Sequence, residues 1–341
     1  MRNKIPQKIP VLVIFAPTAT GKTELLLKLF GGNKAARVIS ADSMQVYRGM
    51  DIGTAKPSPQ EREKLAHHLI DIKNPDEQFS VAEFVERADS LCESFFSEGV
   101  LPIVCGGTGF YIRSFLLGLP QTPEGDEALR EALRAELSKR GEDEMWRELL
   151  SCDPDSAKKI PPSDHYRLLR ALEIYRLTGK PRAVFLQAPK LRDRYDFTTI
   201  ILERDREELY KRIDSRVDKM FEAGLEAEAR GLTQKYGPDA PGMQAIGYRE
   251  FFERHEDGSP LSVEEIAARI KRDSKKYAKK QYVFMRGIPG ATTIRVSQES
   301  DAKADLAKII AKTRAAQAAS IGRGETARLP ARASGQLNKL P

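Results

Sequence analysis

The sequence predicts an α/β fold: a P-loop-type parallel sheet flanked by helices, with an all-helical insertion. Apolar runs alternate with helical patterns along much of the 341 residues, which favours parallel strands covered on both faces. The stretch APTATGKT (16–23) directly follows the first apolar run, as a phosphate loop would. Between Pro120 and about Lys190 the strand signals vanish. The predicted domains are a discontinuous core (1–120 and 191–298), a helical insertion (121–190) and a basic, poorly ordered tail (299–341).

Five apolar runs bounded by turn residues are the predicted strands. They lie at 10–16, 37–41, 100–105, 197–203 and 292–296. Ser80 and Glu83 have the spacing of a capping box and predict a helix that begins at Val81. The insertion contains three helical patterns, ALREALRAELSKRG, EDEMWRELL and SDHYRLLRALEIYRLTGK, the last ended by Gly179. A helical subdomain inserted between two strands would be free to move as a lid.

The formal net charge of +7 is concentrated in two places. Residues 269–286 carry eight basic side chains and one acidic one, and residues 302–341 carry eight and two. Such clusters can bind phosphate-rich partners, although a solvated helix face is the commoner explanation. No apolar run approaches a membrane span, and no signal-peptide pattern precedes the first strand. Three cysteines (Cys92, Cys105, Cys152) indicate neither a disulfide framework nor a zinc site, so we expect a cytoplasmic protein.

The phosphate loop departs from the usual pattern at its first position, where Ala16 replaces glycine. Backbone N–H groups and the positive end of the following helix would face the anion. Lys22 would add a charge, and the Thr23 hydroxyl could reach a magnesium ion. Gly21 fills a position in the tight turn that needs a left-handed conformation, whereas Ala16 is acceptable only with negative φ.

A nucleotide hydrolase would normally carry a Walker B aspartate at the end of a neighbouring strand. The strand VLPIVC instead runs into Cys105-Gly106-Gly107-Thr108, without a carboxylate. The sequence therefore argues against a motor or a nucleotide switch.

Asp42 follows the second predicted strand, and ligands collect at the carboxyl ends of strands in such sheets. A carboxylate there can accept a proton from a nucleophile. A helix N-cap is an equally good explanation of Asp42 on chemistry alone. Thr108 closes the next strand at the same rim and could bond Asp42 or the nucleophile.

A series of motifs in order resembles the tRNA dimethylallyltransferase (tRNA isopentenyltransferase) family, bacterial type. They are APTATGKT, SADSMQVYRGMDIGTAKP, HHLID, CGGTGFYI, LYKRIDSRVDKMFEAGLEAEA, QAIGYRE and YAKKQYVFMRG, spanning roughly Pro10 to Gly287. Two departures are Ala16, and Asp273-Ser274-Lys275 where an Arg-containing run is common. The resemblance implies transfer of a dimethylallyl group from dimethylallyl diphosphate to N6 of the adenosine 3′-adjacent to the tRNA anticodon, with Mg²⁺.

The resemblance also implies roles for individual residues. Asp42 would be the base and Thr108 would position the amine. The donor diphosphate would be bound by Ala16, Pro17, Thr18, Ala19, Thr20, Gly21, Lys22 and Thr23, with Mg²⁺ at Thr23. The tRNA anticodon stem-loop would be bound by Asp42, Ser43, Met44, Gln45, Thr108, Arg130, Tyr166, Arg167, Leu168, Leu169, Arg170, Gln244, Ala245, Ile246, Gly247, Tyr248, Arg249, Lys279, Lys280, Gln281, Tyr282, Phe284 and Arg286. The adenine would have to be extruded from its stack to reach the base.

Arg212 and Arg216 lie four apart on one predicted helix face and are further candidates for the diphosphate. The alternative is a surface ion-pair pattern with Asp214 and Asp218. In the basic segment, Ser262 and Glu265 form a predicted capping box. An apolar stripe (Ile266, Ile270, Tyr277, Phe284) lies largely opposite the lysines, which favours RNA contact over simple solvation.

Several other readings remain open. His67 and His68 lack metal-ligand spacing and are expected in a loop or the core. Trp146 is expected to anchor the core of the insertion. Cys105 is expected to be buried. We expect a monomer. Alternative functions are a small-molecule phosphotransferase, a prenyltransferase acting on free adenine nucleotides, and a non-catalytic RNA-binding module in which Asp42 is only a cap.

Overall fold

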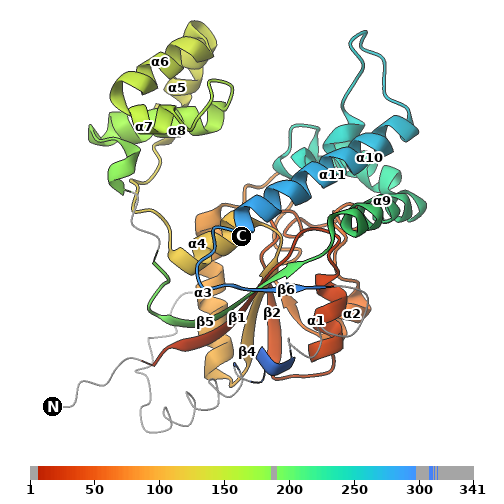
Figure 1. Ribbon diagram of the computed structural model, residues 1–341. Coiled ribbons are helices and arrows are strands. Elements are labelled where there is room, and N and C mark those ends of the chain that lie inside the picture. Colours follow the sequence, from red (N-terminus) through yellow and green to blue (C-terminus); the bar gives the residue numbers. More distant parts are fainter. Residues whose placement is uncertain (1–6, 186–189, 297–306, 310, 312, 314–341) are drawn as a thin grey trace, which may run out of the picture. The chain divides into compact units, whose positions relative to one another are not determined.

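The computed structural model describes residues 7–185, 190–296, 307–309, 311 and 313 (Figure 1). The chain divides into two compact units. The core unit comprises Met1–Leu116 and Leu191–Pro341, and the insertion unit comprises Leu117–Lys190. The predicted C-terminal tail lies almost entirely outside the described residues.

The core unit is built on a six-stranded sheet in the order β3-β2-β4-β1-β5-β6, with every neighbouring pair parallel. The strands are β1 (Ile9–Phe15), β2 (Ala36–Ser40), β3 (His67–His68), β4 (Leu101–Gly106), β5 (Tyr195–Glu203) and β6 (Thr292–Arg295). All five predicted strands are confirmed to within two residues. The prediction for the two histidines was wrong, because they form the short edge strand β3 beside Val38 and Ile39.

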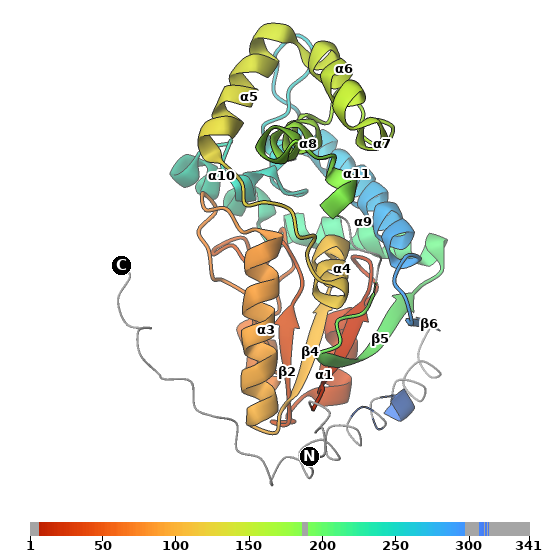
Figure 2. The ribbon, with the colours of Figure 1, turned by 90° about the vertical axis from the view of Figure 1, so that its left-hand side faces the viewer.

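Helices cover both faces of this sheet. Those of the core unit are α1 (Lys22–Phe30), α2 (Pro59–Lys64), α3 (Val81–Ser97), α4 (Gly109–Leu117), α9 (Arg206–Glu222), α10 (Leu225–Tyr236) and α11 (Val263–Met285), with 3-10 turns η2 (Pro241–Gln244) and η3 (Arg249–Phe251). Figure 2 shows α3 and α4 on one face of the sheet and α1 on the other. Because β1 lies between two such layers, all seven of its residues are buried, as a central parallel strand requires.

The two predicted capping boxes have different outcomes. At α11 both halves are formed, since the Ser262 hydroxyl accepts from the Glu265 N–H and the Glu265 carboxylate accepts from the Ser262 N–H. At α3 the Ser80 hydroxyl accepts from the Glu83 N–H, but the Glu83 carboxylate pairs with basic side chains instead. The α3 prediction is therefore only half correct.

The insertion unit is entirely helical within the described residues. It contains α5 (Glu127–Arg140), α6 (Glu142–Cys152), α7 (Pro154–Ala157), α8 (His165–Thr178) and the 3-10 turn η1 (Arg182–Phe185). Leu133, Leu149 and Leu168 form its small core. Trp146 packs against this core and donates its indole N–H to the Ile160 carbonyl at 2.8 Å, as expected of an anchor. Across the described ranges of both units, no helix has the length and apolar character needed to span a membrane.

Candidate active site

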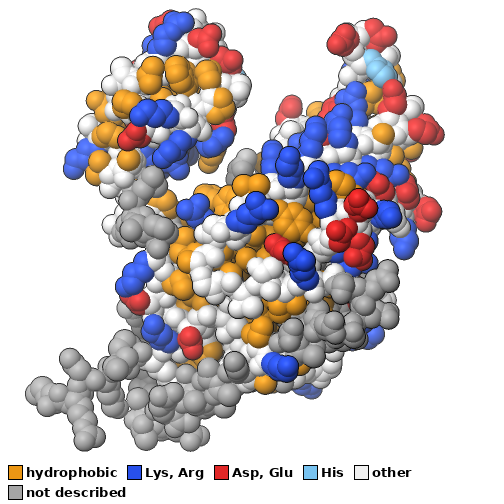
Figure 3. All heavy atoms as spheres, in the orientation of Figure 1, with side chains coloured by type: hydrophobic (Ala, Val, Ile, Leu, Met, Phe, Trp, Pro, Cys, Tyr) orange, Lys and Arg blue, Asp and Glu red, His pale blue; other side chains and the backbone are white. Residues whose placement is uncertain are grey.

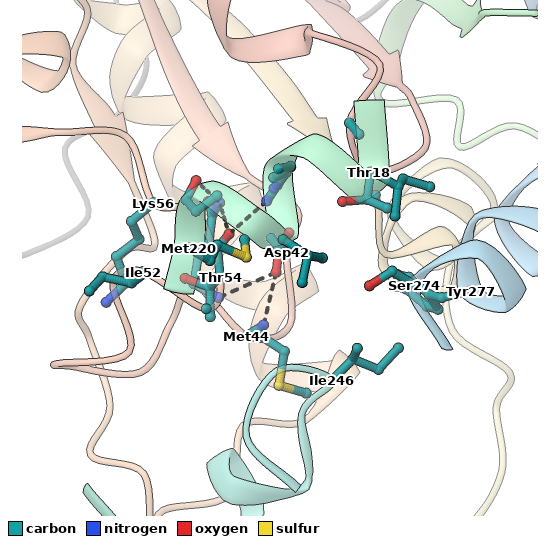
Figure 4. Close-up of a pocket in the computed structure, with 18 of the residues that line it drawn as sticks. Thr18, Asp42, Met44, Ile52, Thr54, Lys56, Met220, Ile246, Ser274 and Tyr277 are labelled. Atoms are coloured by element: carbon teal, nitrogen blue, oxygen red, sulfur yellow. Dashed lines mark hydrogen bonds between the residues drawn. The ribbon is translucent and has the colours of Figure 1, made fainter. Parts of the chain in front are cut away.

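A cavity of about 1240 Å³ lies where three neighbouring strands of the core unit end (Figure 4). Thr18 follows β1, Asp42 follows β2 and Gly107 follows β4, and all three line the cavity. The chain passes from β1 to β2 across β4, so the crevice forms at a switch in strand order. Further lining residues come from 51–57, α9, 244–249 and α11.

The phosphate loop ends in a helix that has no side-chain cap. Gly21 is the N-cap of α1 with φ +97°, a left-handed conformation that favours glycine. Ala19 also has positive φ, +61°, which is uncommon for a residue with a side chain. Ala16 has no positive φ, so the condition for alanine at that position is met. The first recorded bond of the helix is from the Leu25 N–H, which leaves the earlier N–H groups available for an anion.

Two arginines hold the carbonyls of this loop. Arg212 donates to the Ala19 carbonyl at 2.9 Å, and Arg204 donates to the Thr20 carbonyl at 3.2 Å. A Cβ added at Gly21 would lie 3.4 Å from Arg212 and 3.9 Å from Arg204, so both guanidinium groups flank the turn. Sequence reasoning missed Arg204; its position directly after β5 was the available signal.

The surface ion pairs considered for Arg212 and Arg216 are not formed. Asp214 pairs with Lys275, and Asp218 pairs with Lys271. Arg216 instead reaches the Thr54 carbonyl at 3.5 Å and lines the cavity.

Lys22, Arg216 and Asp42 interact electrostatically at the centre of the cavity. Burial lowers the pKa of Lys22, although Asp42 acts in the opposite direction. Burial likewise lowers the pKa of Arg216, again opposed by Asp42. Two partly buried cations beside one carboxylate are less well solvated than cations at the surface, so they favour an anionic ligand.

Asp42 follows β2 but does not cap a helix. Its Oδ1 accepts from the N–H groups of Met44 at 3.0 Å and Gln45 at 3.3 Å, which folds the segment into a turn. No residue in the described part of the chain donates to Oδ2, and the side chain lies in the cavity (Figure 4). The N-cap explanation therefore fails, and one carboxylate oxygen is free for chemistry.

Thr108 contacts the neighbour of Asp42. The Ser43 N–H donates to Thr108 Oγ1 at 3.0 Å, and this hydroxyl lies 3.3 Å from the Ser43 hydroxyl. Gly106 allows this approach, because a Cβ there would lie 2.1 Å from the Ala41 carbonyl oxygen.

Gln281 of α11 connects the phosphate loop to the loop after β4. Its Oε1 accepts from the Thr18 N–H at 3.0 Å, and its Nε2 donates to the Gly107 carbonyl at 2.7 Å. Tyr277 lies one turn earlier and also lines the cavity, and burial together with Asp42 raises its pKa to about 12. Tyr277 is 37% exposed, and its phenol can donate a hydrogen bond, a role that its place in the predicted apolar stripe does not indicate.

Most of the residues predicted to contact tRNA in the core unit fall into three classes; of the others, Thr108 bonds Ser43, Gly247 is buried and Phe284 is half-buried. Met44, Gln244, Ala245, Ile246 and Arg249 line the cavity along with Asp42, Ser43 and Gln45. Tyr248 is fully buried and Gln281 nearly so, while the Tyr282 hydroxyl is bonded to the Arg204 backbone. Lys279, Lys280 and Arg286 are exposed. The side chains of the third class are open to solvent, whereas those of the first class, and Gln281, are reached through the cavity.

The insertion unit shows the same division. Tyr166 is 84% exposed, whereas Leu168 is fully buried in the helical core. Arg130 and Arg170 both pair with Glu173, whose side chain is 1% exposed, at 2.9 and 2.5 Å. The remaining positions, Arg167 and Leu169, are exposed and half-buried, and Arg167 pairs with Asp164.

The basic side chains of α11 form a band on the face shown in Figure 3. Up to residue 276, all the basic side chains of α11 pair with acidic ones, namely Arg269, Lys271, Arg272, Lys275 and Lys276. Within the described residues, Lys279, Lys280 and Arg286 have no acidic partner. The unpaired charge therefore lies at the end of the helix nearest Gln281.

Comparisons with known proteins identify the family of the chain. Residues 45–287 match the family described as IPP transferase. The chain is 44% identical over 282 residues to tRNA dimethylallyltransferase 2 of Geotalea uraniireducens, covering 81% of this chain and 89% of that protein. It is 46% identical over 280 residues to the tRNA dimethylallyltransferase of Symbiobacterium thermophilum, covering 82% and 87%.

Solved structures give the same result. The full-length tRNA isopentenylpyrophosphate transferase of Bacillus halodurans matches with a TM-score of 0.65 and 35% identity, over 92% of this chain and 100% of that one. A eukaryotic dimethylallyltransferase acting on tRNA matches with a TM-score of 0.69 and 28% identity, over 95% and 81%. The chain therefore belongs to the IPP transferase family, together with the tRNA dimethylallyltransferases.

Proposed function

We propose that this protein transfers the dimethylallyl group of dimethylallyl diphosphate to N6 of the adenosine 3′-adjacent to the anticodon in tRNA. The observation that carries the proposal is the cavity, which combines an uncapped phosphate loop and desolvated cations with a carboxylate that has one free oxygen. Family membership supports the reaction class. It favours this reading over a phosphotransferase or an enzyme of free adenine nucleotides.

The reaction forms one bond and breaks another at the same carbon. N6 attacks the allylic carbon, and the diphosphate leaves with the electron pair of the C–O bond. Asp42 Oδ2 accepts the proton that N6 loses, which makes the weakly basic exocyclic amine a competent nucleophile. Ser43, held by Thr108, keeps Asp42 at the rim, so Thr108 acts through this contact.

The departing diphosphate gains negative charge, which the loop is built to stabilise. Lys22, Arg212 and Arg216 supply positive charge, and the first N–H groups of α1 supply donors.

Magnesium fits this site on the chemistry of its donors. No group of three acidic, histidine or cysteine side chains suited to a metal occurs in the part of the chain that the structure describes. Mg²⁺ in phosphate-transfer sites instead uses one or two protein oxygens, substrate phosphates and water. The Thr23 hydroxyl, which lines the cavity, would hold it there. When bound, the ion neutralises the diphosphate.

The tRNA anticodon stem-loop would bind through exposed side chains on both units. We assign the insertion (121–190), with its exposed Tyr166, and the unpaired cations of α11 to this contact. An aromatic side chain can stack on an unpaired base, and lysines neutralise phosphates. We infer a monomeric enzyme that works in the cytoplasm, where its tRNA substrate is found.

The direct test incubates purified protein with dimethylallyl diphosphate, Mg²⁺ and unmodified tRNA, and analyses the nucleosides by mass spectrometry. We expect an adenosine heavier by one five-carbon unit and release of diphosphate. Brisk ATP cleavage with unmodified tRNA would instead favour the phosphotransferase. Modification of AMP but not of tRNA would favour the enzyme of free nucleotides.

A further inference from the structure

We propose that Glu228 and Tyr248 are positioning residues, which hold the segment Asp51–Lys56 against the cavity and so keep Asp42 in place. This inference rests on the proposed function, because it concerns the base of that reaction. It explains why Tyr248, expected to contact tRNA, is fully buried.

The Glu228 carboxylate of α10 binds three successive backbone N–H groups. Oε2 accepts from Asp51 at 3.1 Å and from Ile52 at 2.9 Å, and Oε1 accepts from Gly53 at 3.1 Å. Bonds to a charged acceptor are stronger than those between neutral groups. This side chain therefore fixes the backbone of a loop more than 170 residues away in sequence.

Tyr248 completes this arrangement from a different segment. Its hydroxyl donates to Glu228 Oε1 at 2.6 Å. Its ring packs so closely on Gly53 that a Cβ there would lie 2.5 Å from Tyr248 Cε2. Glycine at 53 and the ring of Tyr248 are thus a matched pair.

The carbonyl groups of the segment Asp51–Lys56 are linked to Asp42 through two side chains. Gln45 Nε2 donates to the Thr54 carbonyl at 3.3 Å and the Ala55 carbonyl at 3.4 Å, and Arg216 also reaches the Thr54 carbonyl. Gln45 in turn donates its N–H to Asp42 Oδ1. A shift of the segment would consequently move both Gln45, which helps to position Asp42, and Arg216, which contributes to its electrostatic environment.

The segment also has a conformation that needs support. Ala55 has φ +45°, in the left-handed region that disfavours a side chain. Such strain persists only where surrounding contacts impose it. The four bonds at Glu228 supply contacts of this kind.

Two substitutions separate positioning from folding. Glu228→Gln keeps the volume but turns an amide NH₂ toward backbone N–H donors, and we expect kcat to fall about 30-fold, within the range for a misplaced catalytic group. Tyr248→Phe keeps the ring on Gly53 and loses one bond, and we expect a fall of about 5-fold. The matched control is Glu226→Gln, on the same helix with only an ion pair to Arg230.

The assay measures kcat and KM for both substrates, with hydrogen exchange of peptide 50–57. We expect KM for dimethylallyl diphosphate to change less than kcat, since Arg216 would shift with the segment while Lys22 and Arg212 keep their places, and we expect exchange of that peptide to quicken in Glu228→Gln. Wild-type kcat in both variants, with the control also normal, would overturn the inference. If Glu228→Gln does not fold, Tyr248→Phe decides alone. A wild-type enzyme that transfers nothing would contradict the proposed function instead.

Discussion

The two sides of the cavity treat their polar groups in opposite ways. On the phosphate-loop side, the first N–H groups of α1 have no side-chain cap. On the side formed by Asp51–Lys56, the buried ammonium of Lys56 is bonded to the Tyr47 carbonyl, Asp51 and Asp71, each at 2.6 Å. We call the first the open side, because these N–H groups of α1 lack a side-chain cap, and the second the saturated side, because the polar groups of Lys56 and its neighbours are hydrogen-bonded.

This difference suggests that the phosphate-loop side binds the ligand and that the side formed by Asp51–Lys56 maintains the geometry of the cavity. An unsatisfied buried donor costs free energy until a ligand arrives, so it contributes to binding. A saturated wall contributes little to binding but keeps its neighbours in a fixed geometry. Substitutions on the open side should therefore reduce turnover, whereas those on the saturated side should reduce stability or positioning.

The largest effect is expected from Asp42→Asn. Asparagine retains an oxygen that can accept from Met44 and Gln45, so the turn should persist while the base is lost. We expect kcat to fall about 10³-fold, in the range for general-base catalysis. Single-turnover transfer measures this, with tRNA affinity as the control. If turnover were unchanged, Asp42 would be only a structural residue and another base would have to exist.

A smaller loss is expected from Lys22→Met. Removing a desolvated cation from the phosphate loop should lower kcat about 10²-fold, because charge on the leaving diphosphate is less well stabilised. The control is Lys28→Met on the same helix, whose exposed side chain pairs only with Glu24. Steady-state kinetics would contradict the open-side interpretation if the two variants behaved alike.

The saturated side predicts a different result for Lys56→Met. The side chain of Lys56 is 3% exposed, and its loss removes a donor from the Tyr47 carbonyl, from Asp51 and from Asp71, of which Asp71 keeps its bond to Arg62. We expect the free energy of unfolding to fall by about 2 kcal/mol, the cost of unpaired polar groups. Urea denaturation measures this, with exposed Lys64→Met as the control. Inorganic diphosphate should bind both variants as it binds the wild type; weakened binding would place Lys56 on the open side.

The sequence predicted the open side better than the saturated one. Lys22, Thr23 and Asp42 could be found because strand ends and a short motif locate them. Glu228 and Tyr248 could not be assigned as partners, because their contact with Asp51–Gly53 joins segments distant in the chain. Burial of Tyr248 and Leu168 also escaped sequence reasoning, since a motif gives residue type but not exposure. The same holds for β3, which is too short to give a pattern.

The same contrast divides α11 along its length. Up to residue 276 its cations are paired with acids, as in Lys271 with Asp218 at 2.5 Å and Lys275 with Asp214 at 2.7 Å. Lys279 and Lys280, one to two turns later, are exposed and have no acidic partner in the described chain. A net charge counted from the sequence gives every lysine the same weight. Among the described residues, the earlier lysines are neutralised by acids, whereas Lys279 and Lys280 are not.

The smallest effect tests this division. We expect Lys279→Ala/Lys280→Ala to weaken tRNA binding about 10-fold and to reduce the slope of log affinity against log salt by about 1 to 2, since two phosphate contacts release fewer counterions. The matched double variant is Lys271→Ala/Lys275→Ala, whose lysines already neutralise Asp218 and Asp214. Its slope should change by less, because removing a paired cation exposes a carboxylate rather than losing a phosphate contact. Equal slopes for the two double variants, measured by filter binding across a salt series, would mean that pairing does not decide which cations of α11 meet RNA.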